Sequence, residues 1–424
     1  MIKTLTKPGR DQIAAVIAQA RRGADRGPLP AKRAALLRAY CEDVAENDLL
    51  SSEPAYLAAA VLSHLGWGRT RRPGTAKVRV FNPEMARDGW HSGHTVIQVV
   101  NDDMPFLVDS LTMCLNEIGR GIQITLHPRL KAVRSSSGTL RDLKPNRPTA
   151  NGRTESFIYM EIGKEIDSGD LRRIQQSLEA TLRDVRAAVE DWQPMLAELR
   201  AGREHIGAHA PSLPGILEES GALVDWLADD HFTLLGYREY RLRKGRDKDS
   251  LIPVAGSGLG LLRDDPDRAA SKLELTGADQ REARAKNPLV ITKSRSRSTV
   301  HRPGYLDQIS IKVFGKGGIP IGVKRFVGLY TSLVYSEKPL DVPLLRLKLR
   351  EVLRESGFDP TSHRGKALQH ILNTFPRDDL FQISFSDLAR IGQDFLDNSR
   401  FTDEFLAERC GFRPFQVRDF ILQP

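Results

Sequence analysis

The sequence has few cysteines, no long apolar run and only a small excess of charge of one sign. Its 424 residues include three cysteines, Cys41, Cys114 and Cys410, and no CxxC pair, which excludes a zinc knuckle and a thioredoxin-like motif. Isolated thiols in apolar surroundings are typical of reduced, buried residues in a cytoplasmic protein. No run of about eighteen apolar residues occurs, so we expect no membrane-spanning helix. The first residues also lack the apolar stretch of a signal peptide.

The charge balance argues against a nucleic-acid partner. There are 63 Lys and Arg residues against 54 Asp and Glu residues, a formal net charge of +9. A net positive field favours anionic partners, but here both signs alternate along most segments, as on solvated helix faces. Hydrophobic residues make up 40% of the chain, which predicts a folded protein. The length indicates about two to four domains.

Motifs for nucleotide, acyl and metal chemistry are missing as well. The sequence has no GxxxxGK[ST] and no GxSxG. Residues 256–260 (GSGLG) lack the GxGxxG spacing and open no helical pattern, so we interpret them as a loop. Two histidine pairs have the spacing of metal ligands but no neighbouring Cys or acidic partner in a suitable position, and we expect neither to bind a metal: His91 with His94, and His205 with His209. The sequence predicts no catalytic residue, metal or cofactor in this chain.

Apolar periodicity predicts an α+β fold in the first half of the chain. Helices fill residues 1–72, and RTRRPGTAK (69–77) is interpreted as a basic linker. After it we expect strands at 77–81, 94–100, 121–133 and 155–162, helices at 104–118 and 169–200, and a polar loop at 135–153. This order is typical of a ferredoxin-like unit, with a four-stranded antiparallel sheet and both helices on one face.

The second half predicts an antiparallel sheet followed by helices. Residues 201–214 are interpreted as a linker, and residues 215–336 contain a helix at 215–229 and strands at 231–243, 288–294, 305–314 and 321–335. A helical region covers 341–410, with helices beginning near Asp341, His363 and Phe385. Residues 411–424 (GFRPFQVRDFILQP) begin like a strand, which indicates either the start of a further, truncated module or an edge strand of an earlier sheet.

Two segments could bind a ligand. In NDDMPFLVDSL (101–111), acidic residues end a strand and a proline precedes a helix, whose amino-terminal amides attract carboxylates, including those of amino acids. The alternative is that Asp103 is only an N-cap and Asp102 only a turn residue. KSRSRSTVHR (293–302) could contact phosphate, but it lacks aromatic residues for base stacking, so we interpret it as a solvated or interdomain face.

Four long blocks resemble the amino-terminal region of the large bacterial NAD-dependent glutamate dehydrogenases. They are NDDMPFLVDSL, HFTLLGYREY (231–240), RFVGLYTSLVYSE (325–337) and SHRGKALQHILNTFPRDDLFQIS (362–384). The resemblance implies a helical segment at 1–72, an ACT-type ferredoxin-like module at 77–202, an antiparallel PAS-like module at 215–336 and a helical region at 341–410. It places the dehydrogenase domain, with its NAD, further along a longer polypeptide.

The resemblance implies a regulatory and oligomerisation region that is inactive by itself. Its partners would be the remainder of the parent polypeptide, further copies in a homo-oligomer and an amino-acid effector at Asn101, Asp102, Asp103, Pro105 and Phe106. ACT modules that bind amino acids have Asp-x-Pro-Gly in this turn, and Phe106 replaces the glycine. We therefore expect its ring to occupy the site, which favours assembly over sensing. The alternative is a stand-alone protein that senses amino acids or binds RNA through a basic surface.

Overall fold

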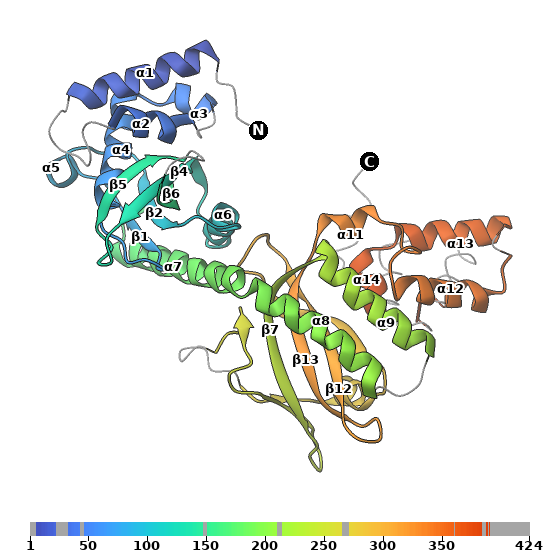
Figure 1. Cartoon of the computed structure of the whole chain (residues 1–424). Coiled ribbons are helices and arrows are strands. Elements are labelled where there is room, and N and C mark those ends of the chain that lie inside the picture. The colour runs from blue at the N-terminus through green and yellow to red at the C-terminus, as the bar shows by residue number, and fades with distance from the viewer. Residues whose placement is uncertain are drawn as a thin grey trace. The chain divides into compact units, whose positions relative to one another are not determined.

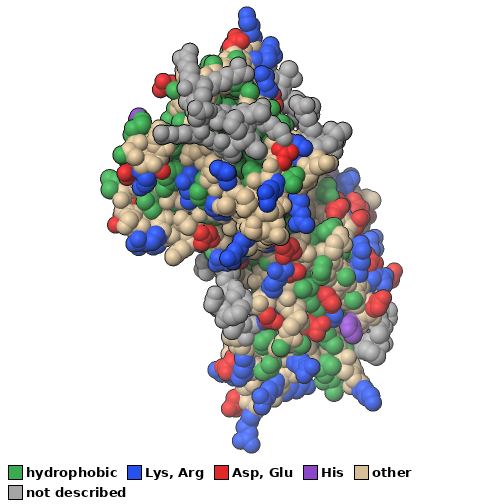
Figure 2. Space-filling view, turned by 60° about the vertical axis from the view of Figure 1, so that its left-hand side comes forward, with side chains coloured by type: hydrophobic (Ala, Val, Ile, Leu, Met, Phe, Trp, Pro, Cys, Tyr) green, Lys and Arg blue, Asp and Glu red, His purple; other side chains and the backbone are tan. Residues whose placement is uncertain are grey.

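The structure, a computed structural model, describes residues 6–22, 33–42, 46–146, 151–209, 214–264, 271–359, 361–383, 387–388 and 390. The chain divides into two compact units. The first unit comprises Met1–Val189 and the loop Ser298–Gly304; the second comprises Glu190–Arg297 and Tyr305–Pro424. Within the described ranges, every helix is too short or too polar to span a bilayer. Figure 2 shows Lys and Arg side chains interspersed with Asp and Glu side chains over the visible face.

The first unit begins with helices that bury one face each. They are α1 (Lys7–Arg22), α2 (Arg33–Glu42), α3 (Glu46–Ser51) and α4 (Pro54–Trp67). Pro54 opens α4, where its missing N–H costs no helical hydrogen bond. Ile13 of α1, Leu36 and Tyr40 of α2 and Val61 of α4 are buried and share one core with the sheet that follows. The described helices end at Trp67, so the helical expectation for residues 1–72 is wrong for 68–72, which form a turn and an isolated bridge from Thr70 to Thr139.

An antiparallel six-stranded sheet follows these helices. Its strands are β1 (Lys77–Phe81), β2 (Thr95–Asp102), β3 (Ile122–Leu126), β4 (Arg129–Arg134), β5 (Leu140–Pro145) and β6 (Arg153–Ile162). Their order is β1-β2-β6-β4-β5, and β3 also pairs with β6. A short helix α5 (Met85–Asp88) lies between β1 and β2. Figure 1 shows α1–α4 on one side of this sheet.

The expected four-stranded sheet is wrong in two places. The single strand expected at 121–133 is broken after Leu126, because Pro128 has no N–H to donate to a ladder. The two pieces instead pair with opposite halves of β6. The expected polar loop at 135–153 contains β5. The sequence gives little sign of this strand, because its only aliphatic residues are Leu140 and Leu143.

Two helices cover the other face of this sheet, as the ferredoxin-like expectation requires. They are α6 (Leu107–Glu117) and α7 (Ser168–Glu190). In β2, Val96 and Val100 share a core with α1–α4, so the alternating residues Ile97 and Val99 face α6 and α7. Figure 1 shows α7 along this side of the sheet. The sheet therefore lies between two helical layers.

The helix expected at 169–200 is two helices. Between α7 and α8 (Trp192–His209) the helix breaks at Asp191. Pro194 explains the break, since it cannot donate to the carbonyl of residue 190 and its ring crowds that carbonyl. The linker expected at 201–214 is also wrong for 201–209, which belong to α8.

The second unit contains an antiparallel seven-stranded sheet of order β10-β8-β7-β13-β12-β11, with β9 paired to β7. The strands are β7 (Phe232–Arg243), β8 (Ser250–Pro253), β9 (Leu259–Gly260), β10 (Leu273–Glu274), β11 (Leu289–Arg297), β12 (Tyr305–Phe314) and β13 (Pro320–Tyr330). Helices α8 and α9 (Pro214–Trp226) lie across it (Figure 1). A π-helical turn, η2 (Leu227–His231), joins α9 to β7, and α10 (Gly277–Arg284) precedes β11.

The last described helices extend the core of the second unit. They are α11 (Ser332–Ser336), α12 (Leu345–Ser356), α13 (His363–Thr374) and α14 (Arg377–Gln382). Leu349, Leu368 and Leu380 belong to the same buried cluster as Ile309 and Phe326 of the sheet. The strand expected at 321–335 ends at Tyr330, because Thr331 starts α11 instead. The helix expected near Phe385 and the segment 411–424 lie outside the described residues.

Candidate functional site

The candidate site lies where β2 leaves the sheet and α6 begins. Asn101 and Asp102 are the last residues of β2 and pair with β6, so the sheet fixes their positions. The chain then turns over four residues, and α6 begins at Leu107. Phe106 occupies the N-cap position and makes no side-chain cap. The alternative in which Asp103 is the N-cap of this helix is therefore wrong.

Asn101 and Asp102 are held in a buried polar network beneath the turn. Arg71 Nη2 donates to Asp102 Oδ1 at 2.6 Å and to Glu155 Oε1 at 2.8 Å. Arg186 Nη2, from α7, donates to Asn101 Oδ1 at 2.7 Å and to Asp102 Oδ2 at 2.7 Å. These contacts tie the end of β2 to β6, to α7 and to the segment before β1.

The charges in this network keep Asp102 ionised. Burial alone would raise the pKa of this carboxyl, but hydrogen bonds and charges from Arg71 and Arg186 outweigh burial and hold its pKa below the usual range. Both carboxylate oxygens of Asp102 are therefore engaged inside the protein. Asn101 and Asp102 support the turn, whereas a ligand would meet the residues that follow them.

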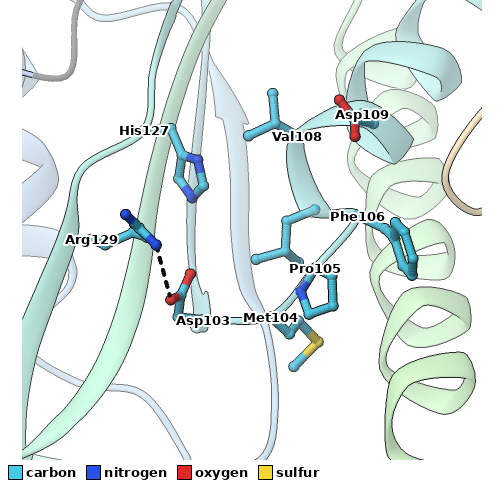
Figure 3. A pocket seen from close by; sticks show the side chains of 9 residues that line it. Asp103, Met104, Pro105, Phe106, Val108, Asp109, His127 and Arg129 are labelled. Atoms are coloured by element: carbon cyan, nitrogen blue, oxygen red, sulfur yellow. Dashed lines mark ion pairs between the residues drawn. The ribbon is translucent and has the colours of Figure 1, made fainter. Parts of the chain in front are cut away.

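Those following residues line a pocket of about 710 Å³. The lining comprises Asp103, Met104, Pro105, Phe106, Leu107, Val108, Asp109, His127 and Arg129. Figure 3 shows the turn and the start of α6 on one side and His127 and Arg129 on the other. The volume lies within the range of about 300–1,000 Å³ that is typical of small-molecule sites.

The polar side of the pocket is a chain of contacts between three strand ends. Ser156 Oγ, buried on β6, donates to Asp103 Oδ1 at 2.8 Å and lies 3.0 Å from His127 Nε2. Arg129 Nη1 lies 4.0 Å from Asp103 Oδ2. The distance between Arg129 and Asp103 is at the upper limit for an ion pair, and more than half of the Arg129 side chain is exposed. Both side chains can therefore contact a ligand in the pocket.

Phe106 does not fill the pocket. Its φ is 70°, in the left-handed region, and its ring packs against the imidazole of His301 with the ring centroids 4.8 Å apart. Figure 3 shows the ring turned away from Asp103, His127 and Arg129. The expectation that this side chain occupies the site is therefore wrong, because the left-handed backbone reverses the direction in which the side chain leaves the turn.

Neither the histidine pairs nor the basic segment 293–302 lines this pocket, although His301 of that segment contacts Phe106. His205 and His209 are helical, and His94 Nδ1 lies 3.2 Å from Glu161 Oε2, a neighbour that the sequence did not reveal. No group of three or more His, Cys, Asp or Glu side chains in the described ranges is placed to hold a metal. In the basic segment, Lys293 Nζ contacts two carboxylates, Asp307 at 2.6 Å and Asp378 at 2.7 Å.

Sequence reasoning anticipated the residues on one side of this pocket and missed those on the other. Asp103, Pro105 and Phe106 line the pocket as expected for a turn before a helix. Arg71 was assigned to a linker, although it is 5% exposed and bonded to two carboxylates. The adjacent residues His127, Pro128 and Arg129 carried the missed signal, since a proline within a strand pattern marks the place where the chain leaves the sheet.

These features define a class of protein: an α+β chain with an antiparallel sheet, two helices on one face of it and a ligand-sized pocket at the β2–α6 turn. Two family models match the sequence, "Glutamate dehydrogenase, ACT1 domain" over residues 36–178 and "Glutamate dehydrogenase, helical motif 1" over residues 342–397. The first contains the whole pocket, and the second contains α12, α13 and α14.

The chain is related to the NAD-specific glutamate dehydrogenases. It is 38% identical to that of Halomonas elongata over 330 residues, which is 77% of this chain and 20% of the relative. It is 38% identical to that of Pseudomonas aeruginosa over 317 residues, 74% of this chain and 19% of the relative. It is 27% identical to that of Mycobacterium tuberculosis over 356 residues, 82% of this chain and 21% of the relative. The chain thus spans about one fifth of the length of these curated relatives.

Proposed function

We propose that this chain is a non-catalytic regulatory and assembly region in the amino-terminal part of an NAD-dependent glutamate dehydrogenase. The observation that carries the proposal is that the ACT1 match contains a ligand-sized pocket at the β2–α6 turn. In the proposed parent, a domain outside this chain converts L-glutamate, NAD and water to 2-oxoglutarate, ammonia and NADH. This chain is proposed to hold neither the catalytic residues nor the NAD, and the parent is proposed to be cytoplasmic.

The proposed modules follow the order of the elements. Residues 1–72 are proposed to form a helical segment, 77–202 an ACT-type module, 215–336 a PAS-like module and 341–410 a helical region. The antiparallel sheet of seven strands with α8 and α9 across it supports the PAS-like assignment. The helical motif match over 342–397 supports the helical region.

The proposed effector is a free amino acid held through both of its charges. The Asp103 carboxylate lies on one side of the pocket opening and would receive the ammonium group. Arg129 would receive the carboxylate, since its planar guanidinium favours a two-point contact with that group. Met104, Leu107 and Val108 offer apolar surface to the side chain of the effector. Ser156 fixes the direction of Asp103.

Calorimetric titration of the full chain with a panel of amino acids at millimolar concentration tests this site. We expect heat from at least one amino acid, and we expect Asp103→Asn and Arg129→Met each to weaken binding at least tenfold, because each removes a charge-assisted hydrogen bond. Arg153→Met is the matched control, since Arg153 is exposed on β6 outside the pocket. No heat with any amino acid would leave assembly as the proposed role.

The non-catalytic role has its own test. The purified chain should produce no NADH from glutamate and NAD, and such turnover would refute the proposal. An immunoblot of source-cell extract with an antibody against this chain should reveal a band about four times heavier than 47.3 kDa, since the 330 matched residues are 20% of the Halomonas relative, which therefore has about 1,650 residues against 424 here. A band at 47.3 kDa would favour a free-standing binding protein.

The proposed homo-oligomer is supported by the edge of the first sheet. In the described part of the chain β1 pairs with β2 alone, so its outer edge presents free backbone donors and acceptors. Edges of this kind pair readily with a second chain. Sedimentation over a range of concentrations tests the proposal, and a monomer at the highest concentration would contradict it for this chain by itself.

A further inference from the structure

Two residues in an unfavourable backbone conformation meet at the rim of the pocket. Among the described residues, four that are not glycine have a positive φ: Phe106, Asp230, His301 and Leu344. Phe106 and His301, with φ of 70° and 77°, are far apart in the sequence and touch through their rings. Residues with a Cβ persist in this region only where surrounding contacts hold them, and they concentrate at binding sites and switches.

The contacts that hold His301 come from α6 and α7. The amide of His301 donates to Ser110 Oγ of α6 at 3.0 Å. Thr299 Oγ1 donates to Asp184 Oδ2 of α7 at 2.8 Å, and the fully buried Val300 lies between them. The loop Ser298–Gly304 is therefore docked on both helices of the first unit, to which it belongs.

His301 meets Phe106 as an uncharged ring. Burial lowers the pKa of His301, with a further lowering from the Arg302 charge that exceeds the opposite effect of Asp109. A neutral imidazole packs against a phenyl ring without the desolvation cost of a charge. The contact is therefore present at neutral pH.

We propose that the loop Ser298–Gly304 controls access to the pocket: His301 holds the Phe106 ring outside it, and loss of this contact lets the ring turn into it. Phe106 is the residue that directly precedes α6, so its backbone can relax without unwinding the helix. Relaxation from the left-handed region to a negative φ redirects Cβ from the side of His301 toward the pocket that Phe106 already borders.

The same loop joins β11 to β12 in the second unit. A ligand that needs the open pocket therefore favours the docked loop, and a change that pulls the loop away closes the pocket. This regulatory meaning rests on the ligand role proposed above, whereas the two positions of Phe106 do not depend on any ligand.

The test measures access to the pocket by thiol modification of the full chain. Val108→Cys places a thiol among the lining residues, and its reaction with N-ethylmaleimide is followed by mass spectrometry of the peptide that contains it. The native Cys41 is buried and its pKa is raised to about 12, so it reacts slowly. We expect His301→Ala to slow the reaction of the introduced thiol about tenfold. Phe106 leaves the left-handed region when the contact is lost, and the free energy released by one such residue changes the ratio of open to closed pocket by about this factor. His301→Phe retains a ring and should leave the rate unchanged.

A second background separates closure from unfolding. With Phe106→Ala there is no ring to enter the pocket, so His301→Ala should have no effect on the rate in that background. An equal rate with and without His301→Ala in the Phe106 protein, or a slowing that persists with Phe106→Ala, would overturn the proposal. Because no ligand is added, a failure of the calorimetric titration leaves this result unaffected.

Discussion

Three guanidinium groups neutralise the two carboxylates that lie beneath the β2–α6 turn. Arg134 donates to both carboxylate oxygens of Glu155, at 2.7 Å and 2.8 Å. Arg71 donates to Glu155 and to Asp102, and Arg186 donates to the second carboxylate oxygen of Asp102. Such a cluster is stable only when every charge keeps its partner, because an ion buried alone is costly. The turn that carries the pocket therefore depends on residues that do not line it.

Replacing Arg71 should lower the urea concentration at which the first unit unfolds. Arg71→Met leaves Glu155 and Asp102 short of a partner, and we expect the free energy of unfolding to fall by about 3–5 kcal/mol. The neighbouring Arg72 is exposed, so Arg72→Met is the matched control and should stay within about 0.5 kcal/mol of the native chain. Urea unfolding of both variants measures the difference, and equal losses would show that the buried network contributes little.

His64 lies at the centre of the layer between α4 and the sheet. Its Nδ1 accepts from the Tyr40 hydroxyl at 2.5 Å and its Nε2 donates to the Val99 carbonyl at 3.2 Å, an arrangement that requires a neutral imidazole. Burial, and after it the charge of Arg79, lower the pKa of His64 from 6.5 to about 3. The folded chain therefore does not take up the proton that the unfolded chain binds near pH 6.5.

Acidification should destabilise the first unit through this histidine. The folded pKa lies below the unfolded one, so the stabilisation is complete above pH 6.5 and is lost as the pH falls toward 3. Between pH 6.5 and pH 5, before most carboxylates titrate, we expect a loss of about 1.5 kcal/mol from this residue. Urea unfolding across that range measures it. His64→Asn should reduce the slope with pH by this amount, and an unchanged slope would contradict the assignment.

At this scale the sequence predicted residues whose role is local. Asp103 and Pro105 were recognised because a strand, a turn and a helix follow one another within eleven residues. His301 could not be found in this way. Its amide bonds Ser110 and its loop neighbour Thr299 bonds Asp184, and both partners lie more than a hundred residues away in the sequence. Contacts of such separation leave no periodic trace in the sequence.

The glycine-rich segment 256–260 shows how an element is fixed by the absence of side chains. Gly260 has a φ of 58° in β9 and its amide donates to Asp191 Oδ2 at 2.7 Å. A Cβ on Gly260 would overlap the Leu235 carbonyl oxygen, and one on Gly258 would overlap that of Leu262. The segment is a close crossing of backbones beside β7, which explains its composition without a nucleotide.

Gly260→Ala should therefore destabilise the second unit. The left-handed φ alone costs about 1–3 kcal/mol for a residue with a Cβ, and the overlap with Leu235 adds to it. Gly215→Ala is the control, because nothing lies within 4 Å of its Cβ position in α9, and we expect a change within about 0.5 kcal/mol. Thermal unfolding compares the two. Similar small effects would mean that the crossing can relax.

The sequence predicted the positions of elements with strong apolar periodicity, but it did not predict where such elements are interrupted. The strands at 77–81 and 305–314 have the expected bounds. The errors fall at Pro128 and Pro194, where one proline ended an otherwise continuous pattern, and in β5, whose sequence LRDLKP is mostly polar. The strand propensity of the residues in β5 is low, and β5 forms because it pairs with β4.

Each unit of the whole molecule has its own buried core. The cluster around Tyr40, Leu57 and Phe157 lies in the first, and the cluster around Ile309 and Phe326 lies in the second. Separate cores of this kind commonly unfold as separate cooperative steps. The stability of the chain is therefore not a single quantity.

Calorimetry of the full chain should resolve two unfolding transitions. We expect Arg71→Met to lower the midpoint of one and Gly260→Ala to lower the midpoint of the other, because Arg71 belongs to the first unit and Gly260 to the second. A loss of about 2 kcal/mol corresponds to a shift of roughly 4–8 °C for a unit of this size. One transition that moves with both variants would mean that the two cores unfold together.

The loop Ser298–Gly304 also imposes an order on synthesis. The ribosome finishes Val189 long before the first unit is complete, because Gly304 follows about 115 residues later. At about 5–20 residues per second, the nascent first unit waits roughly 6–23 s for its last segment. During that interval Phe106 has been synthesised and His301 has not. If the gene were divided between these two residues, Phe106 and His301 would lie on separate polypeptides.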